Sequence, residues 1–203
     1  NRDYSNGDIP NVDPAVNDAK AFRQYAIEAL GISPSNILYA ENATYGKMVT
    51  IFGTENSYRD GQLYKWLRTQ KAVGRVFVYY SGHGAPSDLN GVPRLVPVDA
   101  EPVSIDTTGY SVDTLYKNIS QLPATERSVF IEACFSGGSQ AGAVIRRASP
   151  LNIKVRPGVI PENVTAYTAT SAGEIASWDE ENTISLFTKY YLLGVSGQAD
   201  LKP

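Results

Sequence analysis

The sequence contains one histidine and one cysteine among its 203 residues. A single cysteine excludes an internal disulfide, so cysteine usage does not indicate the redox compartment. No apolar run approaches the roughly 20 residues that a membrane-spanning helix needs. The net charge is −3 and no basic stripe is present, which argues against nucleic-acid binding through bulk charge. This charge balance suits a basic substrate slightly better than an acidic one.

The remaining composition is ordinary for a globular protein, with 42% hydrophobic and 19% charged residues. A chain of this length fits one domain with a sizeable core. It opens with polar, turn-forming residues and without Met or a signal peptide, so we expect it to be part of a longer protein. The compartment is left open, with the cytoplasm as the default.

Strands and helices are predicted to alternate along the chain. Asp13 is expected to cap the first helix, with Pro14 at its first position. Helices are predicted at 13–30, 58–70, 111–122, 140–147 and 183–193, and strands at 36–40, 75–80, 128–133 and 164–170. A long loop is expected at 85–110 and a proline-containing linker at 148–163. This order predicts an α/β fold whose mainly parallel sheet is covered on both faces.

The histidine and the cysteine each follow a short apolar run that is typical of a buried strand. His83 lies in Tyr80-Ser81-Gly82-His83-Gly84, and Cys134 lies in Glu132-Ala133-Cys134-Phe135-Ser136-Gly137. Open α/β folds build their sites at the carboxyl ends of the strands. The sequence therefore predicts that the only imidazole and the only thiol meet at one edge of the sheet, as a cysteine nucleophile and its base must.

A lone cysteine is usually a small buried apolar residue, and a lone histidine is more often packed or exposed than catalytic. Their matching positions favour catalysis. His83 is the only side chain that ordinarily titrates near neutral pH. The backbone N–H groups of Gly84 and Cys134 are predicted to hold an oxyanion.

These two motifs closely resemble those of the caspase-like cysteine peptidases, which include caspases, metacaspases, paracaspases and bacterial relatives. His83 precedes Cys134 by about 50 residues, as in caspases. Further similarities lie at 15–19, 169–178 and 186–193. The resemblance implies a three-layer αβα sandwich and one peptidase domain over 1–203. Within it, 1–147 resembles the large subunit, 148–163 a linker and 164–203 the small subunit. The family's first strand is expected upstream of residue 1 and its last strand downstream of residue 203.

Matching residue by residue, the resemblance places Asp18 and Glu132 in the substrate pocket, although Asp is more usual than Glu at the second position. Asp179 follows Ser177-Trp178, where caspases carry an arginine. Acids in this pocket imply cleavage after Arg, then Lys. Asp18 could instead be a first-turn acid of its own helix, and Asp179 could belong to a solvated turn. Glu132, an acid that ends an apolar strand, fits the pocket better.

The chain is thus predicted to be a cysteine endopeptidase that acts on protein or peptide substrates through His83 and Cys134. Arg146, Arg147, Lys154 and Arg156 make the 146–156 segment a plausible self-cleavage site. The alternatives are a catalytically silent caspase-like module that binds partners, or the same peptidase with a different first-pocket preference. No cofactor is expected. Many metacaspases need calcium. Asp99 and Asp113 fall near the acidic positions involved, but Val112 and Ala141 stand where further acids would be expected, so calcium is not favoured here. Natural substrate, activation signal and oligomeric state stay open.

Overall fold

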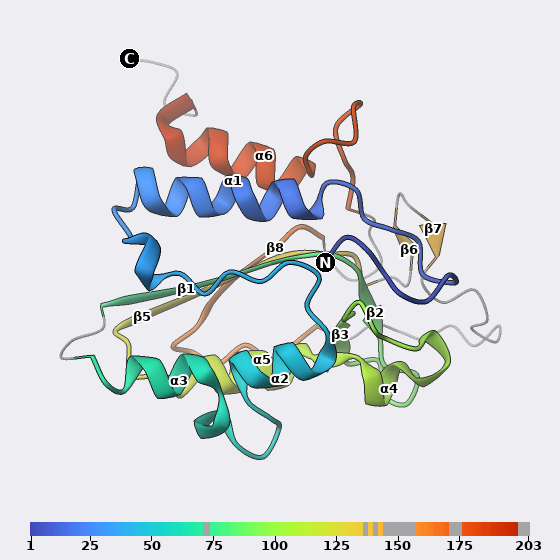
Figure 1. Ribbon diagram of the computed structural model, residues 1–203, viewed down its shortest axis with the longest axis horizontal. Coiled ribbons are helices and arrows are strands. Elements are labelled where there is room, and N and C mark those ends of the chain that lie inside the picture. The colour runs from blue at the N-terminus through green and yellow to red at the C-terminus, as the bar shows by residue number, and fades with distance from the viewer. Residues whose placement is uncertain (71–73, 136–137, 140–141, 144–156, 171–175, 199–203) are drawn as a thin grey trace.

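The computed structural model describes residues 1–70, 74–135, 138–139, 142–143, 157–170 and 176–198. A parallel sheet with strand order β1–β5–β8 lies at its centre. Helices α1 and α6 cover one face of this sheet, and α2, α3 and α5 lie on the other (Figure 1). This arrangement confirms the predicted α/β fold. Among the described helices, none combines the length and apolar character needed to cross a bilayer.

The elements have the following bounds. The α-helices are α1 (Ala15–Glu28), α2 (Tyr45–Phe52), α3 (Gln62–Leu67), α4 (Ile105–Thr108), α5 (Val112–Ser120) and α6 (Leu186–Leu193). The strands are β1 (Arg75–Ser81), β2 (Gly84–Pro86), β3 (Pro93–Leu95), β4 (Tyr110–Ser111), β5 (Glu126–Glu132), β6 (Gly138–Ser139), β7 (Gly142–Ala143) and β8 (Thr165–Thr168). Short 3₁₀ turns span Pro34–Asn36, Tyr58–Asp60 and Pro102–Ser104, and a π-turn spans Gly194–Gln198.

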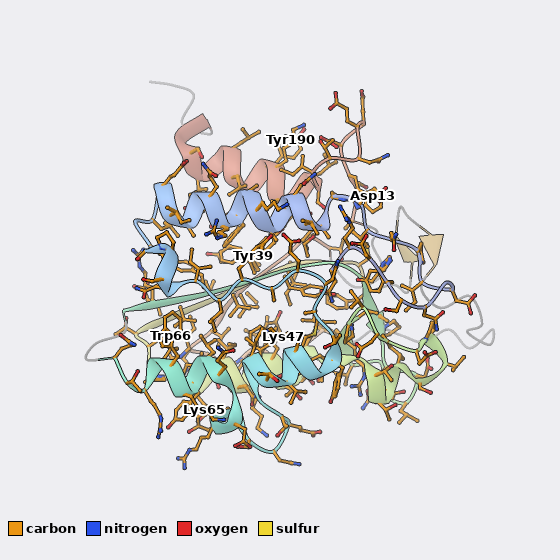
Figure 2. All side chains as sticks on the ribbon, in the orientation of Figure 1. Asp13, Tyr39, Lys47, Lys65, Trp66 and Tyr190 are labelled. Carbon is orange, nitrogen blue, oxygen red and sulfur yellow. The ribbon has the colours of Figure 1, made fainter. Side chains whose placement is uncertain are left out.

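Side chains fill the layers on both faces of the sheet (Figure 2). On the α1 and α6 face, the buried Phe130 of β5 is the centre of an aromatic cluster. Its ring centroid lies 4.9 Å from that of Phe22, 4.6 Å from Tyr167 and 5.0 Å from Tyr191. These partners come from α1, β8 and α6, so one side chain joins four elements. The neighbouring Val129 and Ile131 belong to the core on the opposite face.

Several predicted boundaries were wrong. The first helix begins at Ala15, and its N-cap is Pro14 rather than Asp13. No strand forms at 36–40, where a 3₁₀ turn is followed by irregular chain. The helix predicted over 58–70 is interrupted at Gly61, whose backbone packs so tightly that an added Cβ would lie 2.8 Å from the carbonyl carbon of Phe52.

Other differences are short elements in segments where no regular structure, or a different one, was predicted. The expected loop 85–110 contains β2, β3 and α4, and β2, β3 and β4 form a small antiparallel sheet. Helix α2 was not predicted at all. Within the predicted helix 140–147, the described residues 142–143 form strand β7, which pairs with β6. The rest of that helix and most of the 148–163 linker lie outside the described residues.

The edge of β1 that faces away from β5 borders a cavity of about 620 Å³. Its walls include Phe22, Leu38 and Val76. At one end of this edge the backbone nitrogen of Asn1 lies 2.6 Å from the carbonyl oxygen of Ser81. The strand expected upstream of residue 1 stays a prediction.

We expect Phe130→Ala to lower the free energy of unfolding by about 3–5 kcal/mol, because it removes a buried ring and leaves a cavity between four elements. The matched control is Tyr190→Ala, since the Tyr190 side chain on α6 is 64% exposed. The control should change the free energy by less than about 0.5 kcal/mol. Urea unfolding of both variants measures the difference, and similar effects of the two would contradict the packing described.

Candidate active site

The parallel pairing of β1 and β5 brings the two predicted motifs together. Ser81 lies opposite Glu132, and the Gly82 N–H extends the ladder by donating to the carbonyl of Glu132 at 3.2 Å. His83 and Cys134 each follow two residues beyond these strand ends. Both line one small cavity of about 10 Å³. Its walls are formed by Val12, Ser81, Gly82, His83, Glu132, Cys134, Ala176, Trp178 and Ser185.

His83 is held in a defined protonation state. Its side chain is almost fully buried, with 2% of the residue exposed. The Nε2 atom lies 2.7 Å from the carbonyl oxygen of Pro10. A carbonyl only accepts, so Nε2 carries the proton and Nδ1 has the free lone pair. Burial lowers the pKa of His83 to about 4, although the Pro10 contact opposes this shift. At neutral pH the ring is therefore uncharged and basic at Nδ1.

Cys134 is a buried thiol whose sulfur is already engaged. The backbone N–H of Ala176 donates to Sγ. Burial raises the pKa of the Cys134 thiol, and the Ala176 contact only partly offsets this effect. The negative charge of a thiolate is disfavoured in this environment. In the closed site described here, the sulfur is consequently a protonated thiol covered by the 176–178 chain.

Gly84 lies directly against the cysteine motif. It begins β2, where it pairs with Leu95. A Cβ at this position would lie 2.6 Å from the carbonyl oxygen of Cys134 and equally close to the ring of Phe135. Only glycine allows this approach, because a side chain would collide with backbone. The structure thus brings the backbones of Gly84 and Cys134 together, while their oxyanion role stays a prediction.

Asp18 and Glu132 are buried acids that meet the beginning of α6. Asp18 accepts hydrogen bonds from the Ser185 N–H at 2.8 Å, the Ser185 hydroxyl at 2.6 Å and the Ser81 hydroxyl at 2.9 Å. Glu132 accepts from the N–H of Thr188 at 3.1 Å and from its hydroxyl at 3.2 Å. Both acids thereby satisfy N-terminal N–H groups of a helix that is distant in sequence, a role that α1's own dipole does not explain.

The two carboxyls also influence each other. Burial raises the pKa of Glu132 to about 8, and the nearby Asp18 adds to this shift by repulsion. Burial raises the pKa of Asp18 as well, against the hydrogen bonds from Ser185 and Ser81. Near neutral pH, the Glu132 carboxyl therefore keeps its proton. A cation that entered between the two groups would relieve both the repulsion and the desolvation.

Asp179 does not join the buried carboxyls of Asp18 and Glu132. Its carboxylate accepts from the N–H of Thr183 at 2.8 Å and from the Thr183 hydroxyl at 3.0 Å, and the Lys189 ammonium lies 3.9 Å away. The Thr183 contact lowers the pKa of Asp179. Asp179 thus closes its own turn beside Trp178. The basic residues of 146–156 lie outside the described residues.

Comparison with known proteins decides the family. A family description, the caspase domain, matches residues 1–199 of the chain. The chain belongs to the caspase-domain family of cysteine peptidases. A search of curated proteins found no match.

Family membership makes this caspase domain a cysteine peptidase in general terms, with protein substrates. It also confirms the resemblance that the His83 and Cys134 motifs indicated, over nearly the whole chain. The metacaspase or paracaspase subtype is not specified by this match.

Several site residues of this caspase domain were missed by sequence reasoning. Pro10 contributes a main-chain carbonyl, which has no sequence signature. Tyr4 approaches the site from a distant segment, and no local pattern marks it. Trp178, which the family resemblance had indicated together with Ser177, lines the shared cavity. Ser185 had a usable signal, because serine is a typical N-cap residue of a helix. Its hydroxyl, however, donates to Asp18 instead of capping α6.

The acids considered for calcium have other contacts in this caspase domain. Asp99 accepts the N–H of Tyr45 at 2.8 Å, and Asp113 accepts the N–H of Val159 at 2.9 Å. Within the described part of the chain, His, Cys, Asp and Glu side chains form no group of three suited to a metal ion. The expectation that no metal is required stays a prediction.

The raised pKa of Glu132 predicts a pH-dependent stability. The folded state keeps the proton up to about pH 8, whereas the unfolded chain releases it near the ordinary value of 4.5. The free energy of unfolding should therefore fall as the pH rises between these values and level off above them. We expect Glu132→Gln to flatten this slope, measured by urea unfolding at several pH values.

The control for this experiment is Glu28→Gln, which removes an exposed acid at the end of α1. This variant should keep the wild-type slope. An identical slope in wild type and Glu132→Gln would show that Glu132 is already ionised in the folded protein.

Proposed function

We propose that the protein is a cysteine endopeptidase in which Cys134 is the nucleophile and His83 carries the proton. The observation that supports this proposal most is their shared cavity at the ends of two directly paired parallel strands. The chain's only thiol and only imidazole reach this edge from separate motifs. Open α/β folds commonly bind ligands at such an edge.

In the proposed reaction, the Cys134 thiol transfers its proton to Nδ1 of His83 as the sulfur attacks the peptide carbonyl. The N–H groups of Gly84 and Cys134 stabilise the resulting oxyanion. The imidazolium then protonates the leaving amine, and the C–N bond breaks to leave a thioester. His83 next takes a proton from water, which attacks the thioester and releases the carboxylic acid and the thiol.

The proposed substrate side chain is that of arginine, with lysine second. Asp18 and Glu132 offer two carboxyls, which suit the planar fork of a guanidinium. Their present partners, the N–H and hydroxyl groups of Ser185 and Thr188, are all donors. Guanidinium N–H groups could replace these donors one for one, and they would bring the positive charge that the acid pair lacks.

Binding requires the site to open. A cavity of about 10 Å³ accommodates roughly one water molecule and no arginine side chain. The covering residues Ala176 and Trp178 and the cap residue Ser185 must therefore move before a peptide can reach Cys134. If the wild-type protein shows no peptidase activity under any activating condition tested, the alternative of a catalytically silent caspase-like module is favoured.

A substrate screen tests the proposed specificity. The fluorogenic peptides differ only in the residue immediately before the cleaved bond. The value of kcat/KM should be highest for Arg, several-fold lower for Lys, and below one-hundredth of the Arg value for Asp or Leu. Asp18→Asn and Glu132→Gln should each lower kcat/KM for Arg about 10- to 100-fold, the loss expected for one charged hydrogen-bonding partner. Glu28→Gln is the charge-matched control. Preference for Leu would support a different first pocket.

Self-processing in 146–156 is part of the proposal, since this segment supplies four basic residues to an enzyme proposed to cleave after them. Wild type incubated alone should yield two fragments with new ends in this segment, because the same nucleophile can act on its own chain. Cys134→Ala and His83→Ala should stay intact. Mass spectrometry locates the cut, and fragmentation of the Cys134→Ala protein would indicate a contaminating protease.

A further inference from the structure

The main chain of His83 is held at both of its polar groups by tyrosine hydroxyls. The His83 N–H donates to Oη of Tyr4 at 2.9 Å. The Tyr80 hydroxyl donates to the His83 carbonyl at 2.8 Å, and the Val96 N–H donates to the same oxygen at 3.0 Å. Both hydroxyl oxygens also lie near the carbonyl oxygen of Val96, that of Tyr80 at 3.1 Å and that of Tyr4 at 3.5 Å. Because these groups are buried, this network restricts the His83 peptide strongly.

Gly82 makes this network possible. Its φ of 153° is a conformation that glycine adopts readily. A Cβ at Gly82 would lie 2.8 Å from the Tyr80 hydroxyl oxygen and 3.0 Å from that of Tyr4. The glycine before His83 thus provides the space in which both hydroxyls reach the His83 peptide.

Tyr4 also contacts the imidazole itself and is linked to the segment that supplies its partner. The ring centroids of Tyr4 and His83 are 5.0 Å apart, with a tilt of 48°. The Tyr4 N–H donates to the side-chain oxygen of Asn11 at 3.0 Å, next to Pro10. One residue therefore touches the His83 backbone and the His83 ring and fixes the turn that presents the Pro10 carbonyl.

We propose that Tyr4 is a positioning residue that keeps Nε2–H of His83 on the Pro10 carbonyl and so leaves Nδ1 as the basic nitrogen. Tyr80 assists by fixing the carbonyl of the same residue. The proposal rests on the proposed peptidase function for its kinetic consequence, but the tautomer itself is a property of the resting protein. Neither tyrosine takes part in the reaction directly.

The tautomer can be read without any substrate, because His83 is the only histidine. In ¹⁵N-labelled wild type at neutral pH, imidazole shifts should report a single Nε2–H form. Tyr4→Phe should give shifts averaged between the two tautomers, since it removes the hydroxyl acceptor of the His83 N–H and frees the peptide to move. Tyr80→Phe should cause a smaller change, because the Val96 N–H still holds the carbonyl.

The matched control is Tyr110→Phe. It also removes a buried tyrosine hydroxyl, which donates to the carbonyl of Gly53 at 2.9 Å. The melting temperature should fall by a similar amount in Tyr4→Phe and Tyr110→Phe, whereas only Tyr4→Phe should change the tautomer. In peptide hydrolysis, Tyr4→Phe should lower kcat at least tenfold and leave KM within twofold, and Tyr110→Phe should change neither.

Two results separate this proposal from the proposed function. An unchanged tautomer and unchanged kcat in both Tyr4→Phe and Tyr80→Phe would overturn the positioning role, even in an active peptidase. A wild type without hydrolytic activity would contradict the peptidase proposal, and the NMR comparison of Tyr4→Phe with Tyr110→Phe would still decide whether Tyr4 sets the tautomer.

Discussion

The parallel register between β1 and β5 determines the position of each group in the site. Ser81 and Glu132 lie side by side at the strand ends, and His83 and Cys134 follow at equal distances along the chain. Side chains alternate between the faces of a sheet, so a slip of one residue would send one motif to the opposite face. The aromatic packing of Phe130 against α1 and α6 opposes such a slip. The core thereby enforces the geometry of the edge at which His83 and Cys134 lie.

In the proposed function, the two buried acids would connect substrate recognition to the folding of α6. Asp18 and Glu132 occupy the N-terminal end of this helix, where backbone N–H groups and the helix dipole favour negative charge. The same two carboxyls suit a guanidinium. The donor groups of Ser185 and Thr188 and a guanidinium would therefore compete for the same lone pairs on these carboxyls. A basic substrate of the proposed kind that displaced Ser185 and Thr188 would loosen the beginning of α6. Its binding would then favour the open form of the site.

Sequence reasoning located the parts of the fold that strong local patterns specify. The apolar runs of β1 and β5 and the periodic apolar face of α1 were correct within a few residues. The 36–40 strand and the continuous 58–70 helix were wrong because tertiary contacts, such as the packing of Gly61 on Phe52, overrode local preference. His83 and Cys134 were identifiable because their chemistry is rare in this chain. Pro10, Tyr4 and Thr188 act through contacts between segments far apart in sequence, which no local pattern reveals.

The closed site keeps both proposed catalytic groups uncharged for one physical reason. Burial lowers the pKa of His83 and raises that of Cys134, so desolvation disfavours imidazolium and thiolate together. Withdrawal of the 176–178 chain would admit water or a polar substrate and weaken both effects at once. The two pKa values would then approach each other, and proton transfer from sulfur to Nδ1 would become easier. Opening of the site would thus provide access and nucleophile activation in a single step, without any additional charged residue.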